Sequence, residues 1–94
     1  MVRIKLFSIL AELAGKREIE IKIDNKLTVK EILPLIFSET NEKFKKFIYD
    51  EKNNFLKEFI NIVLNEKILR KEEINNVLLK NEDILALLTP IEGG

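Results

Sequence analysis

The fold is decided by residues 18–37, which read EIEIKIDNKLTVKEILPLIF. Residues Glu18–Ile23 alternate charged side chains with isoleucine, the period-two pattern of a strand with one buried face. The Asp24-Asn25 pair that follows favours a turn. Thr28 and Glu31 have the spacing of a capping box, in which each side chain satisfies a free backbone N–H at the start of a helix. This stretch therefore predicts a strand, a turn and a helix in immediate succession.

The predicted helix carries a single apolar stripe. Its apolar side chains recur at intervals of three and four residues and so share one helix face: Val29, Ile32, Leu33, Ile36 and Phe37. Such a face has to be buried against another layer of structure, and the alternating strand supplies a matching apolar face. We therefore expect a helix packed across a β-sheet.

The N-terminal residues continue this pattern. Val2, Ile4 and Leu6 alternate with polar residues and predict another half-buried strand, while residues 9–15 predict a short helix closed by a left-handed glycine, Gly15. Phe7 falls on the polar face of the first strand. Either that face is partly covered, or Phe7 belongs to a binding surface.

The C-terminal half supplies the remaining strands. Residues 59–64 and 67–69 are rich in β-forming residues and predict a hairpin. Because its Asn65-Glu66 turn lacks glycine, we expect a longer or distorted loop there rather than a tight two-residue turn. Residues 84–88 are apolar on both faces, as in a central strand. The predicted fold class is α+β, with about four to five strands in one mixed sheet, one main helix and short extra helices.

The region between main helix and hairpin is less regular. Residues 41–49 have apolar side chains at helical spacing, and residues 50–54 form a polar loop. Counted from Asp50, this loop lacks the glycine and glutamate of an EF-hand, so a calcium site is not expected. The acidic pairs Glu72-Glu73 and Glu82-Asp83 lie beside lysines in polar stretches, and we interpret both as solvated surface.

The composition is that of one small domain, with 46% apolar and 34% charged residues in 94, so residues 1–94 are predicted to be a single domain. Sixteen basic residues balance sixteen acidic ones, which disfavours nucleic acid or a membrane surface as a partner. Arg3 and Lys5 interrupt what would be the apolar segment of a signal peptide, so we expect a cytoplasmic protein.

The chain contains neither cysteine nor histidine. This excludes a thiolate nucleophile, a zinc–thiolate site and a histidine general base. We therefore expect no catalytic groups of its own and no metal site.

Several segments together resemble the ubiquitin-like β-grasp sulfur carriers, the MoaD/ThiS family. They are the opening strand Val2–Phe7, the segment Leu10–Gly15, Thr28-Val29 at the helix start, Ile62–Asn65, and the ending Thr89-Pro90-Ile91-Glu92-Gly93-Gly94. The resemblance spans essentially the whole chain and is closest to the small subunit of molybdopterin synthase. It implies a ubiquitin-like β-grasp fold.

The resemblance also implies that Gly94 is the reacting residue. In this family an adenylating enzyme of the ubiquitin-activating type (MoeB/ThiF-like) uses ATP to activate the terminal carboxylate, which becomes a thiocarboxylate. The large subunit of molybdopterin synthase then receives the sulfur, and the carrier binds no permanent cofactor. Gly93 lacks a Cβ, which suits a tail that threads a narrow channel. The apolar residues implied to contact these partners are Phe7, Ile68, Leu88, Pro90 and Ile91.

We expect residues 91–94 to form a flexible tail. Extended at about 3.3 Å per residue, it would reach roughly 13 Å. Ordering it costs about 1–2 kcal/mol per residue, so the body of the carrier must dock as well.

The chain departs from the family pattern at Asn65-Glu66, at Asn81-Glu82-Asp83 and at Thr89 and Glu92 in the tail, which leaves the subfamily open. The alternatives are a protein modifier conjugated to lysines through Gly94, a thiamine-pathway sulfur carrier, or a β-grasp module that binds through its sheet alone.

Overall fold

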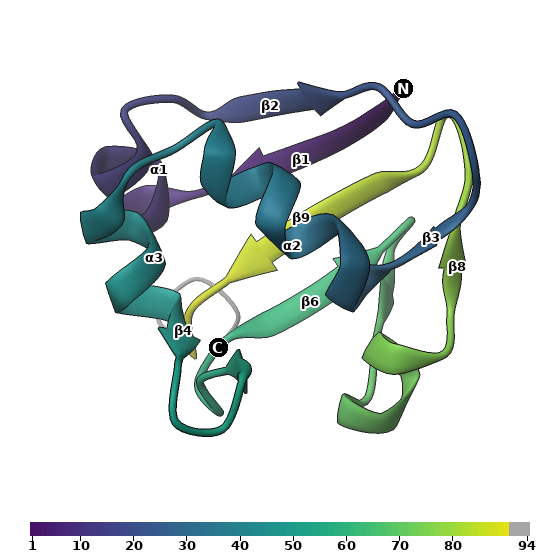
Figure 1. Cartoon of the computed structure of the whole chain (residues 1–94). Coiled ribbons are helices and arrows are strands. Elements are labelled where there is room, and N and C mark those ends of the chain that lie inside the picture. Colours follow the sequence, from purple (N-terminus) through teal and green to yellow (C-terminus); the bar gives the residue numbers. More distant parts are fainter. Residues whose placement is uncertain (91–94) are drawn as a thin grey trace.

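The computed structural model describes residues 1–90, so the predictions for Ile91, Gly93 and Gly94 lie outside the described residues. Thirteen elements follow one another within these described residues (Figure 1). They are β1 (Val2–Leu6), α1 (Ser8–Ala14), β2 (Glu18–Ile21), β3 (Leu27–Thr28), α2 (Val29–Ser38), α3 (Glu42–Ile48), β4 (Tyr49–Asp50), β5 (Phe55–Leu56), β6 (Asn61–Leu64), β7 (Lys67–Ile68), the 3-10 helix η1 (Lys71–Asn75), β8 (Leu78–Leu79) and β9 (Ile84–Leu88).

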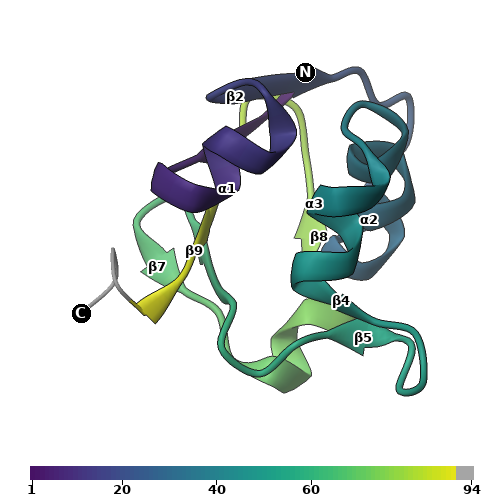
Figure 2. The ribbon, with the colours of Figure 1, turned by 90° about the vertical axis from the view of Figure 1, so that its left-hand side faces the viewer.

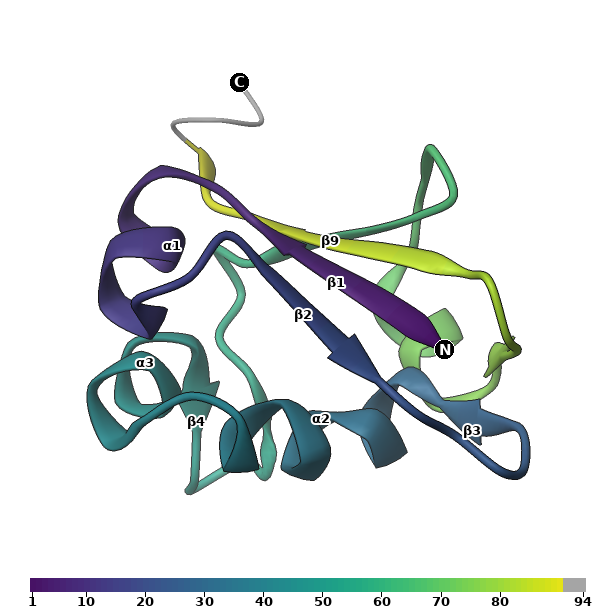
Figure 3. The same ribbon diagram turned by 90° about the horizontal axis from the view of Figure 1, so that it is seen from above.

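The main sheet is mixed and has five strands in the order β2-β1-β9-β6-β7. β1 and β9 are parallel, and every other pair of neighbours is antiparallel. Figure 3 shows α2 and α3 in a layer on one side of this sheet. The predicted α+β class and strand number are therefore confirmed, with the final strand β9 in the centre.

The core lies between the sheet and α2. Val2, Ile4 and Leu6 of β1 are buried with Leu85 and Leu87 of β9. From the helix side, four members of the predicted stripe of α2, Val29, Ile32, Leu33 and Ile36, are at most 2% exposed. The fifth, Phe37, is half-buried. No helix in residues 1–90 is long and apolar enough to cross a membrane.

The predicted helix caps are formed. The Thr28 hydroxyl accepts a hydrogen bond from the Glu31 backbone N–H at 3.1 Å, and the Glu31 carboxylate accepts one from the Thr28 N–H at 2.8 Å. Gly15 closes α1 with a φ of 77°, the left-handed conformation that glycine adopts without strain.

The less regular region is tied to the rest of the molecule by a second cap. Asn41 accepts a hydrogen bond from the Phe44 N–H, which starts α3, and its side-chain amide donates to the Leu13 carbonyl in α1 at 2.8 Å. The polar loop at residues 51–54 joins the paired strands β4 and β5. The short pair β3–β8 and the helix η1 were not predicted from the sequence.

The expectation of a long or distorted loop at Asn65-Glu66 is wrong. Leu64 pairs directly with Lys67, so the hairpin β6–β7 has a two-residue turn. Both turn residues have positive φ, 48° for Asn65 and 74° for Glu66. Asn65 is held there by contacts outside the hairpin, because its side chain accepts a hydrogen bond from the Ile84 N–H at 2.8 Å and its own N–H donates to the Ile84 carbonyl at 2.9 Å.

The interpretation of Asp83 as solvated surface is also wrong, because its side chain is only 4% exposed. One carboxylate oxygen accepts a hydrogen bond from the Asn65 side-chain amide at 2.9 Å, and the other accepts one from the Lys80 backbone N–H at 2.8 Å. The carboxylate thus joins the β6–β7 turn to the start of β9. Its neighbour Glu82 has a side chain that is 91% exposed, as predicted.

Asp83→Asn should destabilise the protein by roughly 2 kcal/mol, because an amide presents a donor where Asp83 now accepts from two donors. Urea-induced unfolding measures this change. Glu82→Gln is the matched control and should change the free energy of unfolding by less than about 0.5 kcal/mol. Equal effects of the two substitutions would show that the buried carboxylate is not a structural link.

Candidate functional site

The face of the main sheet opposite α2 is divided into a charged half and an apolar half. On β1 and β2, Arg3 is opposite Glu20, and Lys5 is opposite Glu18. Across β9, β6 and β7 the same face carries apolar side chains at alternating positions: Ile84, Ala86, Leu88, Val63 and Ile68. In Figure 1, α2 lies in front of the sheet, so this face points away from the viewer.

The apolar half is continuous across three strands. Val63 is paired with Ala86 on one side and with Ile68 on the other, so these side chains form one cross-strand row. Phe7 extends the patch beyond β1, since its extended backbone (φ −128°, ψ 152°) continues the alternation of Arg3 and Lys5. We call this set the docking face: Phe7, Val63, Ile68, Ile84, Ala86 and Leu88.

The docking face exposes large apolar side chains to solvent. Ile68 is 66% exposed and Phe7 is 41% exposed, while Val63, Ala86 and Leu88 are half-buried. A hollow of about 470 Å³ lies beside Phe7 and is also lined by Lys5, Ser8 and Arg17. A contiguous apolar patch of this kind, bordered by charged residues, is typical of a protein-binding surface.

The docking face reaches the end of β9. Because β1 and β9 are parallel, with Leu6 paired to Leu87, Phe7 follows β1 at the same edge of the sheet where Leu88 ends β9. Pro90 is exposed two residues further along. Figure 2 shows β9 and β7 on the side of the molecule away from α2 and α3. The apolar patch therefore borders the point from which residues 91–94 continue.

The structure brings three of the predicted contact residues, Phe7, Ile68 and Leu88, onto one face. Sequence reasoning missed Val63, Ala86 and Ile84, although the apolar character of both faces of residues 84–88 was a usable signal. Phe59 is also 39% exposed, but its ring packs edge-on to Phe47 of α3 at 5.6 Å, so we do not assign it to the docking face.

Glu73 supports the strand that carries Ile68. Its carboxylate accepts a hydrogen bond from the Arg70 backbone N–H at 2.8 Å and lies 3.5 Å from the Lys67 ammonium in β7. That backbone hydrogen bond holds the pKa of Glu73 below its ordinary value of 4.5, with the Lys67 and Arg70 charges acting in the same direction. Glu73 is thus a structural carboxylate and not the freely solvated group that its sequence context indicated.

A partner that covers the docking face would be bound mainly by burial of apolar surface. Within residues 1–90, no three acidic side chains come together as a metal site requires. The geometry is typical of a recognition surface, and it borders Pro90, the last residue that the structure describes.

Comparison with known proteins shows the family of this chain. A protein-family model, described as the ThiS family, matches residues 4–94 of the sequence. The chain belongs to the ThiS family. No curated protein matches it in sequence comparison.

Solved structures agree with the family. Haloferax volcanii SAMP1 is 26% identical with a TM-score of 0.81, covering 99% of this chain and 98% of that one. A chain of the Amycolatopsis orientalis BexX/CysO complex is 26% identical with a TM-score of 0.77 and full coverage, 100%, of both chains. A Pyrococcus furiosus protein, provisionally described as molybdopterin converting factor subunit 1, is 27% identical with a TM-score of 0.68 and 95% coverage of both chains. The ubiquitin-like β-grasp fold is thereby confirmed, and the chain is of the sulfur carrier and small modifier class.

Glu73→Gln should destabilise the protein at neutral pH and change its response to acid. A carboxylate with a lowered pKa contributes stability above its unfolded pKa of about 4.5 and loses that contribution as the pH falls through the folded value. The difference in unfolding free energy between the variant and the unmodified protein should therefore shrink below about pH 4.5. Urea unfolding across this range tests it, and a pH-independent difference would contradict the assignment.

Proposed function

We propose that this ThiS-family chain is a sulfur carrier whose C-terminal Gly94 carries a thiocarboxylate, and that it acts as the small subunit of molybdopterin synthase. The observation that carries the proposal is the family match, which extends through residue 94 and so includes the diglycine end. The similarity to the Pyrococcus furiosus protein described as a molybdopterin converting factor subunit supports this choice of pathway.

The proposed chemistry takes place at a carboxylate, which is a poor electrophile until its oxygen becomes a good leaving group. A Gly94 oxygen would attack the α-phosphorus of ATP, expelling pyrophosphate and forming an acyl-adenylate. A sulfur nucleophile supplied by a partner would then displace AMP. The carrier supplies only the acyl group, which agrees with a chain that contains neither histidine nor cysteine.

The docking face would hold the carrier while its tail enters a partner's active site. Ordering residues 91–94 costs about 1–2 kcal/mol each, and burial of apolar surface at about 25 cal/mol per Å² offsets this cost. Ile68 and Phe7 are the most exposed members of the face and have the most surface to bury. The partners would be an adenylating enzyme of the ubiquitin-activating type and the large synthase subunit.

Intact mass spectrometry tests the reaction directly. Incubation with an active adenylating enzyme of this type, ATP and a sulfur donor should replace one oxygen of the chain by sulfur. Deletion of Gly94 should abolish the mass change, because the carboxylate of the shortened tail, now that of Gly93, ends about 3.3 Å short of the reacting position. An unchanged mass of the full chain, with an enzyme active on its own carrier, would contradict the proposal.

A second candidate function is that of a protein modifier joined to lysines through Gly94. The similarity to Haloferax volcanii SAMP1, a protein described in a related structure as small archaeal modifier protein 1, favours it. The two candidates differ in the final acceptor. Covalent conjugates that disappear when Gly93 and Gly94 are deleted would favour the modifier, whereas a stable complex with one synthase subunit would favour the carrier.

Ile68→Asp should weaken binding to the adenylating enzyme by about tenfold or more, because it places a charge in the apolar row. The side chain is already 66% exposed, so the fold should be retained. Leu78→Asp is the matched control, since Leu78 is 52% exposed but lies in β8, outside the main sheet. Titration calorimetry compares the affinities of the two variants. Equal affinities would show that the docking face is not part of the interface with the adenylating enzyme.

A further inference from the structure

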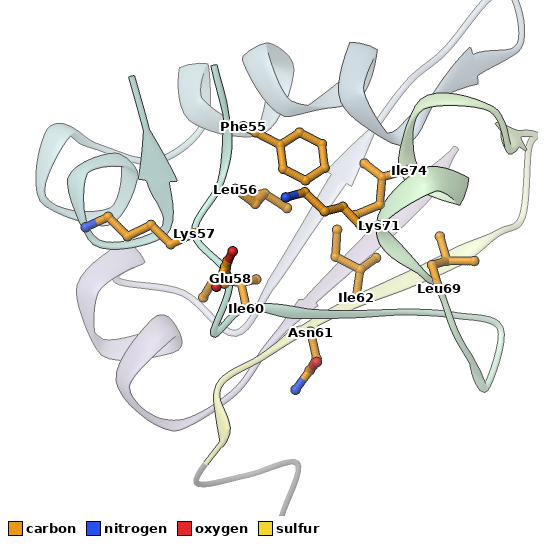
Figure 4. A pocket seen from close by; sticks show the side chains of 10 residues that line it. All are labelled: Phe55, Leu56, Lys57, Glu58, Ile60, Asn61, Ile62, Leu69, Lys71 and Ile74. Atoms are coloured by element: carbon orange, nitrogen blue, oxygen red, sulfur yellow. The ribbon is translucent and has the colours of Figure 1, made fainter. Parts of the chain in front are cut away.

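A groove lies on the other side of β6 from the docking face, between β5 and η1 (Figure 4). Ile62 points to this side of the strand, whereas its neighbour Val63 belongs to the docking face. The floor of the groove is apolar and is formed by Leu56, Ile60, Ile62, Leu69 and Ile74.

The size of the groove limits what it can hold. Its volume is about 240 Å³. Cofactor and drug-sized ligands occupy pockets of roughly 300–1,000 Å³. The groove is therefore too small for such a ligand but large enough for one large apolar side chain.

The groove continues into a second hollow of about 470 Å³. Phe55 and Lys71 line both, and the Lys71 ammonium lies 5.5 Å from the centre of the Phe55 ring. Lys30 of α2 lies further along the second hollow, together with Asn53 and Asn54. The two hollows are adjacent, because they share the side chains of Phe55 and Lys71, and we call them together the trough. Adjacent hollows suit an extended chain better than a compact molecule.

The charges along the trough are uneven. In the part of the chain that the structure describes, Lys30 has no ion pair, and Lys71 has only its contact with the Phe55 ring. Glu72, which lines the second hollow, is 3.6 Å from Arg70. At the opposite end, Glu58 lies at the rim, and the Lys57 ammonium donates to the Lys46 carbonyl. The Lys71 end is therefore suited to acidic side chains.

We propose that this groove binds an extended acidic segment of a protein partner, with one large apolar side chain of that segment in the groove and its carboxylates near Lys71 and Lys30. The site uses neither the docking face nor Gly94, so it can be occupied while the tail is engaged elsewhere. It gives the protein a second partner surface that does not depend on the chemistry of the tail.

A synthetic peptide tests the proposal on the full chain. The probe is an acetylated and amidated peptide, Asp-Glu-Asp-Phe-Asp-Glu-Asp, followed by nitrogen–proton NMR spectra of the protein. Saturable shifts should appear at the amides of Leu56, Ile60, Leu69 and Ile74, and not at Val63 or Ile68. The same peptide with serine in place of phenylalanine should bind about tenfold more weakly, because it leaves the groove unfilled.

Two substitutions at exposed rim residues should change the affinity in opposite directions. Lys71→Glu should weaken binding about fivefold, and Glu58→Lys should strengthen it about threefold. Lys22→Glu and Asp24→Lys make the same changes in net charge at exposed positions that line none of the hollows described here. They should alter the affinity by less than about twofold.

The gain of affinity in Glu58→Lys separates recognition from damage to the fold, since a damaged groove would only lose affinity. Three results would overturn the proposal: absence of saturable shifts, equal binding of the phenylalanine and serine peptides, or rim variants that match their net-charge controls.

Discussion

The central position of β9 is the constraint on which the rest of the structure depends. This strand pairs in parallel with β1 and in antiparallel with β6, and it buries Leu85 and Leu87 against α2. Because the last strand of residues 1–90 is in the middle of the sheet, Thr89 and Pro90 follow a central strand and not an edge strand. The buried Asp83 carboxylate fixes the start of β9, since it joins that point to the β6–β7 turn.

The parts of the fold that could be predicted from the sequence are those with a sustained local period. The strands β1 and β2 and the helices α1, α2 and α3 each bury one regular set of side chains, so alternation or three-to-four spacing reveals them, whereas β9 is marked by a continuous apolar run. The pair β3–β8 has two residues in each strand and brings together distant segments, so no local pattern marks it. At Asn65-Glu66 the absence of glycine predicted a long loop, which is wrong. Hydrogen bonds to Asp83 and Ile84 outweigh the cost of positive φ in a two-residue turn.

The site was partly predictable for the same reason. Strand parity was enough to place Phe7 and Leu88 on the solvent side of the sheet, whereas the expectation for Ile68 came from the family resemblance. The residues that connect them, Val63 and Ala86, could not be identified until the strand order was known, because only the pairing of β6 with both β9 and β7 makes the row continuous. The prediction that Asp83 is solvated was wrong for a similar reason. A carboxylate beside a lysine in the sequence can still be buried by a turn from elsewhere in the chain.

The strand β6 connects the two surfaces of the molecule. Successive residues of a strand point to opposite faces, so Val63 contributes to the docking face while Ile62 forms the floor of the groove beside η1. The hairpin turn at Asn65-Glu66 and the hydrogen bond from the Leu69 N–H to the Ile62 carbonyl fix both side chains at once. A shift of register by one residue would exchange the two faces and disrupt both surfaces together. The Asp83–Asn65 link, which stabilises this register, would therefore support the proposed partner recognition on both sides of the sheet, although it belongs to neither surface.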